Sequence, residues 1–178
     1  IDDFYKTLKD RNKMSYTLHP LFKTRGVPGT HDINLIKKFF YFVKNKRFKK
    51  IKLPKFDKSM DDRLKKRYWF NIKERPEIVI LEGWCVGAKP QLNSLIKQPT
   101  NILEKYEDKD LIWRKYVNEK LKRDYKKLFA MIDCYIFMKI PNFKIVLKWR
   151  LLQENKLKKM SRYKKKIMSY NEIKRFIM

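Results

Sequence analysis

The sequence of 178 residues predicts an α/β fold with a mostly parallel sheet. Two short, nearly continuous apolar runs, at residues 77–81 and 134–140, have the composition of strands that are buried on both faces. Segments with a three-to-four-residue apolar spacing, which is typical of amphipathic helices, lie around these runs. The resulting order of strand, helix, strand, helix, strand, helix is typical of layered α/β domains.

The first predicted helix covers residues 31–45, because its apolar side chains fall on one face and either Thr30 or Asp32 can cap its start. A short strand is expected at residues 51–56, where apolar side chains alternate with lysines. Pro54 places this strand at an edge or at a strand end, because proline has no N–H to donate to a neighbouring strand.

Three more helices are predicted toward the C-terminus. A long one covers residues 111–132, where the apolar side chains keep the helical spacing over several turns. The others cover residues 143–158 and 171–177, and Ser169 can cap the start of the last helix.

The chain has 46 Lys and Arg residues against 19 Asp and Glu residues, which gives a formal net charge of +27. Such a charge is typical of nucleic-acid-binding proteins. Lysine, however, far outnumbers arginine, the residue best suited to read bases and grip phosphates, and the lysines are scattered through every predicted element. Residues with AT-rich codons are abundant, whereas only two alanines occur. We therefore attribute the charge mainly to an AT-rich genome and expect no nucleic-acid partner.

The two cysteines, Cys85 and Cys134, form no C-x-x-C pair and have no histidine beside them at metal-binding spacing. This favours a reduced intracellular compartment. The longest apolar runs have about five residues, against the roughly 20 that a membrane-spanning helix needs. No signal peptide is visible, so we expect a cytoplasmic protein without a membrane partner.

All four glycines lie in two short segments, residues 24–32 (TRGVPGTHD) and 80–90 (ILEGWCVGAKP). Glycine is needed where φ is positive or where the backbone approaches a ligand closely, so these segments are either ordinary turns or ligand-binding loops. Glu82 follows a predicted buried strand and should lie at the carboxyl edge of the sheet, where α/β proteins bind ligands. A carboxylate there can orient magnesium, although a solvent-facing Glu82 is the alternative.

The first seven residues, IDDFYKT, resemble the D-x-F-Y segment of the uridine kinase, phosphoribulokinase and pantothenate kinase family, and LEGW (81–84) resembles its Walker-B-like strand end. A finer resemblance is to the D-glycerate 3-kinase branch of this family. It is carried, in order, by RGVPGTHD (25–32), LPKFDKSMDDR (53–63), VILEGWCVG (79–87), WRKYVNEKLKRDYKKLFAMID (113–133) and VLKWRLLQENKL (146–157).

The resemblance implies a P-loop NTPase-like three-layer α/β/α fold, with residues 1–178 as a single partial kinase domain. The family carries a phosphate loop, G-x-x-x-x-G-K-[ST], before the D-x-F-Y segment, but glycines at positions 26, 29, 83 and 87 alone leave no place for it. We therefore expect the fold to lack its first strand and phosphate loop at the N-terminus, and to be incomplete at the C-terminus as well. Alone, this chain should be inactive.

The resemblance also implies an ATP-dependent small-molecule kinase that transfers the γ-phosphate to a hydroxyl of D-glycerate, giving 3-phosphoglycerate, with ATP and Mg²⁺ as cofactors. Asp2 would be the catalytic base, Glu82 would hold the magnesium through water, and Arg150 would neutralise the transferring phosphoryl group. Asp2 and Glu82 are thus also the expected metal-binding residues. Asp3, the second choice for the base, and Gly83 would lie against the nucleotide.

An acceptor site for glycerate is expected around the RGVPGTHD turn, since a carboxylate substrate needs a cation with forked donors. Its predicted substrate-binding residues are Arg25, Thr30, His31, Asp32, Lys58 and Arg63. Two alternatives remain: an orphan kinase of the same group with another small substrate, and a non-catalytic or nucleic-acid-binding basic protein.

Overall fold

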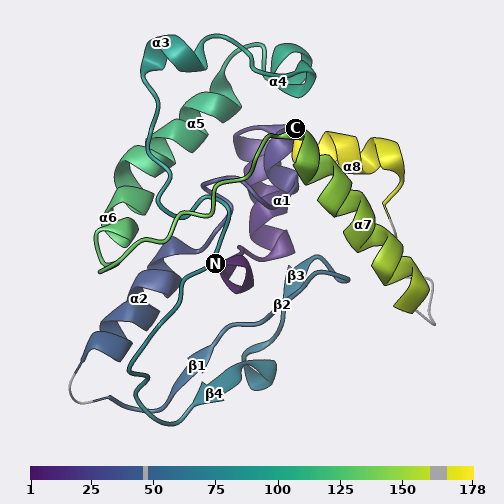
Figure 1. The fold of residues 1–178 in the computed structure, drawn as a ribbon. Helices are drawn as coiled ribbons and strands as arrows, with labels where there is room; N and C mark the ends of the chain where they lie inside the picture. The colour runs from purple at the N-terminus through teal and green to yellow at the C-terminus, as the bar shows by residue number, and fades with distance from the viewer. Residues whose placement is uncertain (46–47, 161–167) are drawn as a thin grey trace. The chain divides into compact units, whose positions relative to one another are not determined.

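A computed structural model of the chain describes residues 1–45, 48–160 and 168–178 (Figure 1). These residues form two compact units. One contains Ile1–Gln98 and Asp108–Tyr135, and the other contains Pro99–Glu107 and Ile136–Met178. In the described ranges no helix is long and apolar enough to cross a membrane. The single partial domain that the sequence suggested stays a prediction.

The first unit begins with three short helical elements and a longer helix, α2. Their bounds are η1 (Asp2–Phe4), α1 (Leu8–Thr17), η2 (Pro20–Lys23) and α2 (Ile33–Lys44). Helix α2 confirms the first predicted helix, and its start is capped by Asp32, whose carboxylate accepts a hydrogen bond from the Leu35 N–H at 3.1 Å. The buried side chains of α2 lie on one face, as the apolar spacing predicted.

The core of the first unit is built mainly by α2, η1 and the helical segment near residue 125. Because aromatic and branched side chains from these elements are removed from water together, their burial is the main stabilising contribution. The core residues are Ile1, Phe4, Ile33, Ile36, Phe40, Cys85, Tyr125, Leu128 and Phe129.

The sheets of the first unit are small and antiparallel. Strand β1 (Ile51–Leu53) pairs with β4 (Phe70–Ile72), and β2 (Phe56–Asp57) pairs with β3 (Asp62–Arg63) to form a hairpin. The 3₁₀ helix η3 (Lys66–Tyr68) lies between β3 and β4. The strand predicted at residues 51–56 is therefore divided in two, with Pro54 at the break. The predicted, mostly parallel sheet is not confirmed, because every strand pair in the described residues is antiparallel.

The strands predicted at residues 77–81 and 134–140 do not form in the described structure. Residues 77–81 keep the alternation of a strand, since Val79 and Leu81 pack against the core while Ile78 and Ile80 are 79% and 86% exposed. No described residue forms a backbone ladder with them. An apolar run can predict an extended, half-buried segment, but a strand also needs a neighbour that shares its hydrogen bonds.

The long helix predicted at residues 111–132 is present in three parts. They are α5 (Ile112–Lys120), a π-helical turn η4 (Leu121–Tyr125) and α6 (Lys126–Phe129), and the short helix α3 (Asn93–Ile96) precedes them. The π-helical turn matters for the site, because it ends at Tyr125, whose side chain is completely buried.

The second unit consists of α4 (Ile102–Glu107), α7 (Lys144–Met160) and α8 (Tyr170–Ile177). Helices α7 and α8 confirm the last two predicted helices. Ser169 and Glu172 form a reciprocal capping box at the start of α8, as the predicted cap at Ser169 requires. Arg175 of α8 forms an ion pair with Glu107 at the end of α4.

Candidate functional site

The candidate site is organised by two backbone segments that lie side by side, residues 2–6 and residues 30–32. The Lys6 N–H donates to the Thr30 carbonyl and the Asp32 N–H donates to the Phe4 carbonyl, both at 2.8 Å. A β-bridge joins Tyr5 to His31 between these two hydrogen bonds. The D-x-F-Y and RGVPGTHD motifs, which are separate in the sequence, therefore meet in the fold.

Two glycines allow the RGVPGTHD segment to fold as a tight turn. Gly26 has a φ of 143° and Gly29 a φ of 106°, values that other residues rarely adopt. At Gly29 an added Cβ would also lie 2.9 Å from the Tyr116 ring. The buried Thr30 hydroxyl closes the turn, accepting from the Gly26 N–H at 3.1 Å and donating to the Val27 carbonyl at 2.7 Å.

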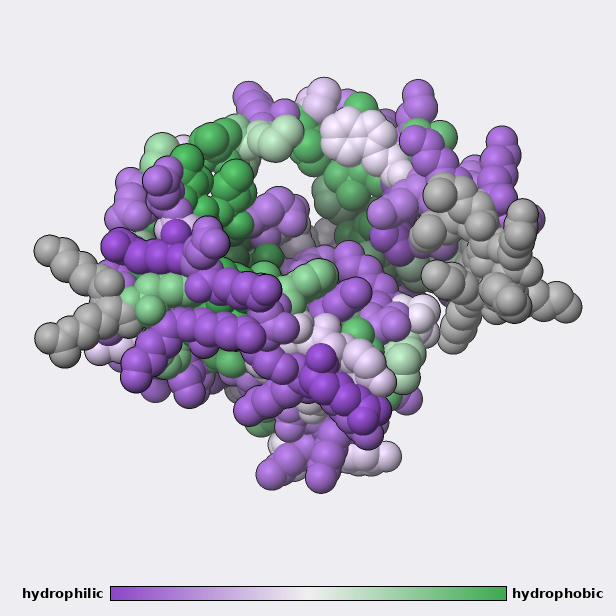
Figure 2. Space-filling view, turned by 90° about the horizontal axis from the view of Figure 1, so that it is seen from below, coloured by the Kyte–Doolittle hydropathy of each residue, from purple (hydrophilic) through white to green (hydrophobic). Residues whose placement is uncertain are grey.

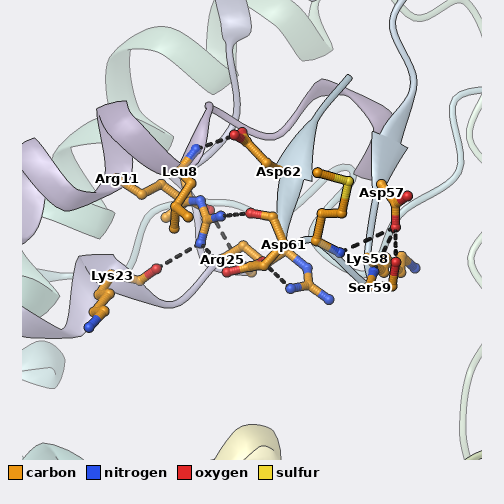
Figure 3. A network of polar contacts seen from close by, with 12 residues as sticks. Leu8, Arg11, Lys23, Arg25, Asp57, Lys58, Ser59, Asp61 and Asp62 are labelled. Atoms are coloured by element: carbon orange, nitrogen blue, oxygen red, sulfur yellow. Dashed lines mark hydrogen bonds and ion pairs between the residues drawn. The ribbon is translucent and has the colours of Figure 1, made fainter. Parts of the chain in front are cut away.

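The β2–β3 hairpin brings four charged side chains, those of Lys58, Asp61, Asp62 and Arg63, to these two segments and to neighbouring residues, and Figure 3 shows the first three. Three of them make ion pairs: Lys58 with Asp2 at 2.9 Å, Asp61 with Arg25, and Arg63 with Asp32 at 3.0 Å. The fourth, Asp62, accepts a hydrogen bond from the Leu8 N–H at 2.8 Å. The structure therefore brings together five of the charged residues that the resemblance assigned to the site, namely Asp2, Arg25, Asp32, Lys58 and Arg63.

Arg11 is a site residue that the sequence analysis missed. Its side chain is fully buried, and its guanidinium donates to the Lys23 carbonyl at 2.7 Å, to the Asp61 carboxylate at 3.0 Å and to the Asp61 carbonyl. A buried arginine must be paired in this way, because its charge cannot be left without partners. No feature of the sequence distinguishes Arg11 from the other cations of so basic a chain.

Asp2 presents a carboxylate that is 40% exposed at the centre of the site. Partial burial alone would raise its pKa, but hydrogen bonding and charge from Lys58, with a contribution from Tyr5, lower the pKa below the usual value. Asp2 is thus ionised at neutral pH, which a proton acceptor requires. The neighbouring Asp3 uses its carboxylate to accept the Phe56 N–H at 2.9 Å, a contact that ties η1 to the hairpin.

His31 lies behind this charged layer, in a buried aromatic cluster. Its ring stacks on Tyr5 with centroids 4.4 Å apart, and its Nδ1 is 2.6 Å from the hydroxyl of Tyr125. Burial lowers the pKa of His31 to about 3, so the ring is neutral at physiological pH. The Tyr125 hydroxyl also accepts the Gly29 N–H at 2.9 Å, which connects the π-helical turn to the RGVPGTHD segment.

The segment after residues 77–81 reaches the same region through a backbone carbonyl and a tryptophan side chain. The Ile1 nitrogen donates to the Glu82 carbonyl at 2.6 Å, and the Trp84 indole donates to the Gly26 carbonyl at 3.0 Å. At Gly83 an added Cβ would lie 2.3 Å from the Ile1 side chain, so a larger residue does not fit there. The Glu82 side chain itself is exposed.

The described residues contain no cluster of three or more His, Cys, Asp or Glu side chains that could hold a metal ion. The two carboxylates predicted for this role, Asp2 and Glu82, nevertheless lie on backbone segments joined by the Ile1–Glu82 hydrogen bond. One or two carboxylates are enough for Mg²⁺ when phosphate oxygens and water complete its shell. The donor set is therefore compatible with magnesium in a nucleotide complex.

Arg150, the predicted lid residue, belongs to the second unit. Its guanidinium contacts Gln153 at 2.7 Å and Glu154 at 2.6 Å, and it lies 5.1 Å from the centroid of the Phe176 ring. These contacts fix it between α7 and α8, and its role near a phosphoryl group stays a prediction.

The sequence is similar to those of curated kinases, including the following two. The uncharacterized kinase mug58 of Schizosaccharomyces pombe is 31% identical over 168 residues, which cover 89% of this chain and 58% of that protein. The chloroplastic D-glycerate 3-kinase of Arabidopsis thaliana is 26% identical over 162 residues, which cover 86% of this chain and 33% of that protein. The chain thus spans less than two thirds of these relatives. No family model matches the sequence.

The fold is similar to a solved structure of D-glycerate 3-kinase from Cryptococcus neoformans. The TM-score is 0.78 at 28% sequence identity, and the match covers 99% of this chain and 63% of the solved chain. Sequence and fold therefore agree with the resemblance of the motifs, and the chain is homologous to kinases that include proteins named D-glycerate 3-kinase.

Proposed function

We propose that this chain forms the acceptor-binding part of an ATP-dependent kinase that phosphorylates a hydroxyl of D-glycerate to give 3-phosphoglycerate. The observation that carries the proposal is the position of Asp2, an ionised carboxylate that pairs with Lys58 of the β2–β3 hairpin. Asp61 of the same hairpin pairs with Arg25 of the RGVPGTHD turn. A small hydroxy acid needs both features: a base for the hydroxyl and a cation for the carboxylate.

In this proposal Asp2 accepts the proton of the acceptor hydroxyl as the hydroxyl oxygen attacks the γ-phosphate of ATP. Arg25 binds the carboxylate of the acceptor, because its side chain is more exposed than those of the other two arginines of the site, Arg11 and Arg63. Magnesium would be held by Asp2 and Glu82 and would neutralise charge on the phosphates. Thr30 and His31 would shape the site from behind rather than bind the acceptor directly, since both are buried.

We favour the kinase over the alternative of a nucleic-acid-binding protein, on the arrangement of the cations in the described residues. Figure 2 shows hydrophilic side chains spread over most of the face that it presents, with hydrophobic side chains between them. Several cations of the site are used in ion pairs within the chain. A phosphate-binding face would instead gather unpaired Lys and Arg with exposed aromatic residues.

A coupled ADP-release assay on the natural protein tests the proposal. D-glycerate should stimulate ADP release, whereas uridine, pantothenate and ribulose 5-phosphate should not. Asp2→Asn should lower turnover by about 10²- to 10⁴-fold, the usual contribution of a general base, with little change in the affinity for ATP. If another acceptor stimulates ADP release, the chain is still a kinase but D-glycerate is not its substrate. If Asp2→Asn keeps full turnover, Asp2 is not the catalytic base.

A further inference from the structure

Asp61 lies in the turn of the β2–β3 hairpin and faces two arginines (Figure 3). Its carboxylate contacts Arg11 at 3.0 Å and also pairs with Arg25. The backbone at Asp61 is left-handed, with a φ of 52°, which is unusual for a residue other than glycine. The side chain is 39% exposed, so this carboxylate lies at the surface of the site and not in the core.

The two arginines depend on Asp61 to different degrees. Arg11 is buried and also donates to the carbonyls of Lys23, Lys6 and Asp61 itself, so it keeps partners without the carboxylate. Arg25 is 19% exposed, and within the described ranges Asp61 is the acid that it pairs with. Its guanidinium otherwise lies 5.4 Å from the centroid of the Phe56 ring. The Arg25–Asp61 pair is therefore the one that an incoming anion can exchange.

We propose that Asp61 is an internal competitor that occupies Arg25 and thereby sets the affinity and the charge selectivity of the acceptor site. An acceptor that carries a carboxylate replaces the Asp61 carboxylate on Arg25. A neutral polyol cannot make this exchange, because it offers no charge to replace that of Asp61. The inference rests on the proposed function, in which Arg25 binds the carboxylate of the acceptor.

The hairpin is suited to such an exchange because few of its own contacts resist it. Its strands share two residue pairs, Phe56 with Arg63 and Asp57 with Asp62. Phe56 anchors the base of the hairpin, through its N–H bond to Asp3 and its ring contact with Tyr5. The turn and the second strand contact residues 2–32 through the side chains of Lys58, Asp61, Asp62 and Arg63. Partly exposed ion pairs contribute little each, so one of them can be exchanged while the others hold the hairpin in place.

Asp61→Asn tests the proposal, with Asp62→Asn as the matched control. Both substitutions remove one negative charge from adjacent positions, but Asp62 contacts the Leu8 N–H, which an asparagine oxygen can still accept. Affinities of the natural protein for D-glycerate, acetate and glycerol are measured by titration. Removing a partly exposed competing charge should tighten the binding of D-glycerate and acetate about three- to tenfold in Asp61→Asn. Asp62→Asn should change the affinity for D-glycerate and acetate less than about twofold, as expected for a screened surface charge. Glycerol should bind equally to the wild-type protein and to both variants.

Equal or weaker carboxylate binding in Asp61→Asn would overturn the proposal, and so would an equal gain in Asp62→Asn, which would show a general charge effect. Acetate separates this outcome from a failure of the proposed function, because it tests Arg25 even if glycerate is not the acceptor. If Asp61→Asn does not fold, hydrogen exchange of residues 58–61 in the wild-type protein decides. Saturating acetate should accelerate exchange there, and unchanged or slower exchange would refute the displacement of Asp61.

Discussion

Replacing Tyr125 with phenylalanine should cost a large part of the stability of the first unit. The Tyr125 side chain is completely buried, and its hydroxyl pairs with the Gly29 N–H at 2.9 Å and with His31 Nδ1 at 2.6 Å. Tyr125→Phe keeps the ring but leaves both of these polar groups without a partner. Each such buried group costs about 1–3 kcal/mol, so we expect the free energy of unfolding to fall by about 2–6 kcal/mol.

Urea denaturation measures this loss, provided that the m-value stays constant. Tyr135→Phe is the matched control, since its hydroxyl donates to the Phe129 carbonyl at 2.6 Å but its side chain is 50% exposed. Water can replace that hydrogen bond, so the control should lose less than about 1 kcal/mol. If Tyr125→Phe loses no more than Tyr135→Phe, the hydroxyl does not hold the RGVPGTHD turn and the reasoning is refuted.

Three further predictions concern pH, thiol reactivity and backbone exchange. The pKa of His31 is lowered to about 3, so the unfolded state binds a proton between about pH 6.5 and pH 3 that the folded state does not. Stability should therefore fall as the pH drops through this range, by at most about 1.4 kcal/mol per unit, and an equally steep loss in His31→Gln would exclude His31 as the cause. Burial raises the pKa of Cys85 to about 11, whereas Cys134 is exposed, so iodoacetamide should label Cys134 first by mass spectrometry; faster labelling of Cys85 would contradict its burial. The amides of residues 78–81 have no ladder partner in the described structure and should exchange much faster in the 178-residue chain than those of α2; protection there would reveal a strand partner.

The helices could be predicted from the sequence because their signals are local. Asp32 and Ser169 lie within three residues of the N–H groups that they cap, and the apolar spacing of α2 specifies which face is buried. The long predicted helix was right in extent but not in detail. Its π-helical turn ends at Tyr125, whose ring contacts His31 and Phe129, and the spacing of apolar residues does not indicate such a turn.

Five of the charged residues predicted for the candidate site lie together in the structure, but their pairing was not predicted, and the role of each residue stays a prediction. The resemblance selected Asp2, Arg25, Asp32, Lys58 and Arg63, and the structure brings these residues together. It did not indicate which cation meets which acid, because that depends on the register of the β2–β3 hairpin against two distant segments. Arg11 and Tyr125 were missed for the same reason, since burial alone distinguishes them from the other basic and aromatic residues.

The strand predicted at residues 77–81 does not form, although the segment keeps the alternating burial of a strand. Its alternation is real, because Val79 and Leu81 face the core while Ile78 and Ile80 face outward. An extended segment with apolar side chains on both faces satisfies its backbone and its outer face only when another strand and a covering layer lie beside it. The described residues provide neither, although the adjacent Glu82 carbonyl is tied to Ile1 at the candidate site. The apolar run therefore predicts that residues 77–81 can pair with a further strand beneath a covering layer. In the described residues the segment is extended but unpaired.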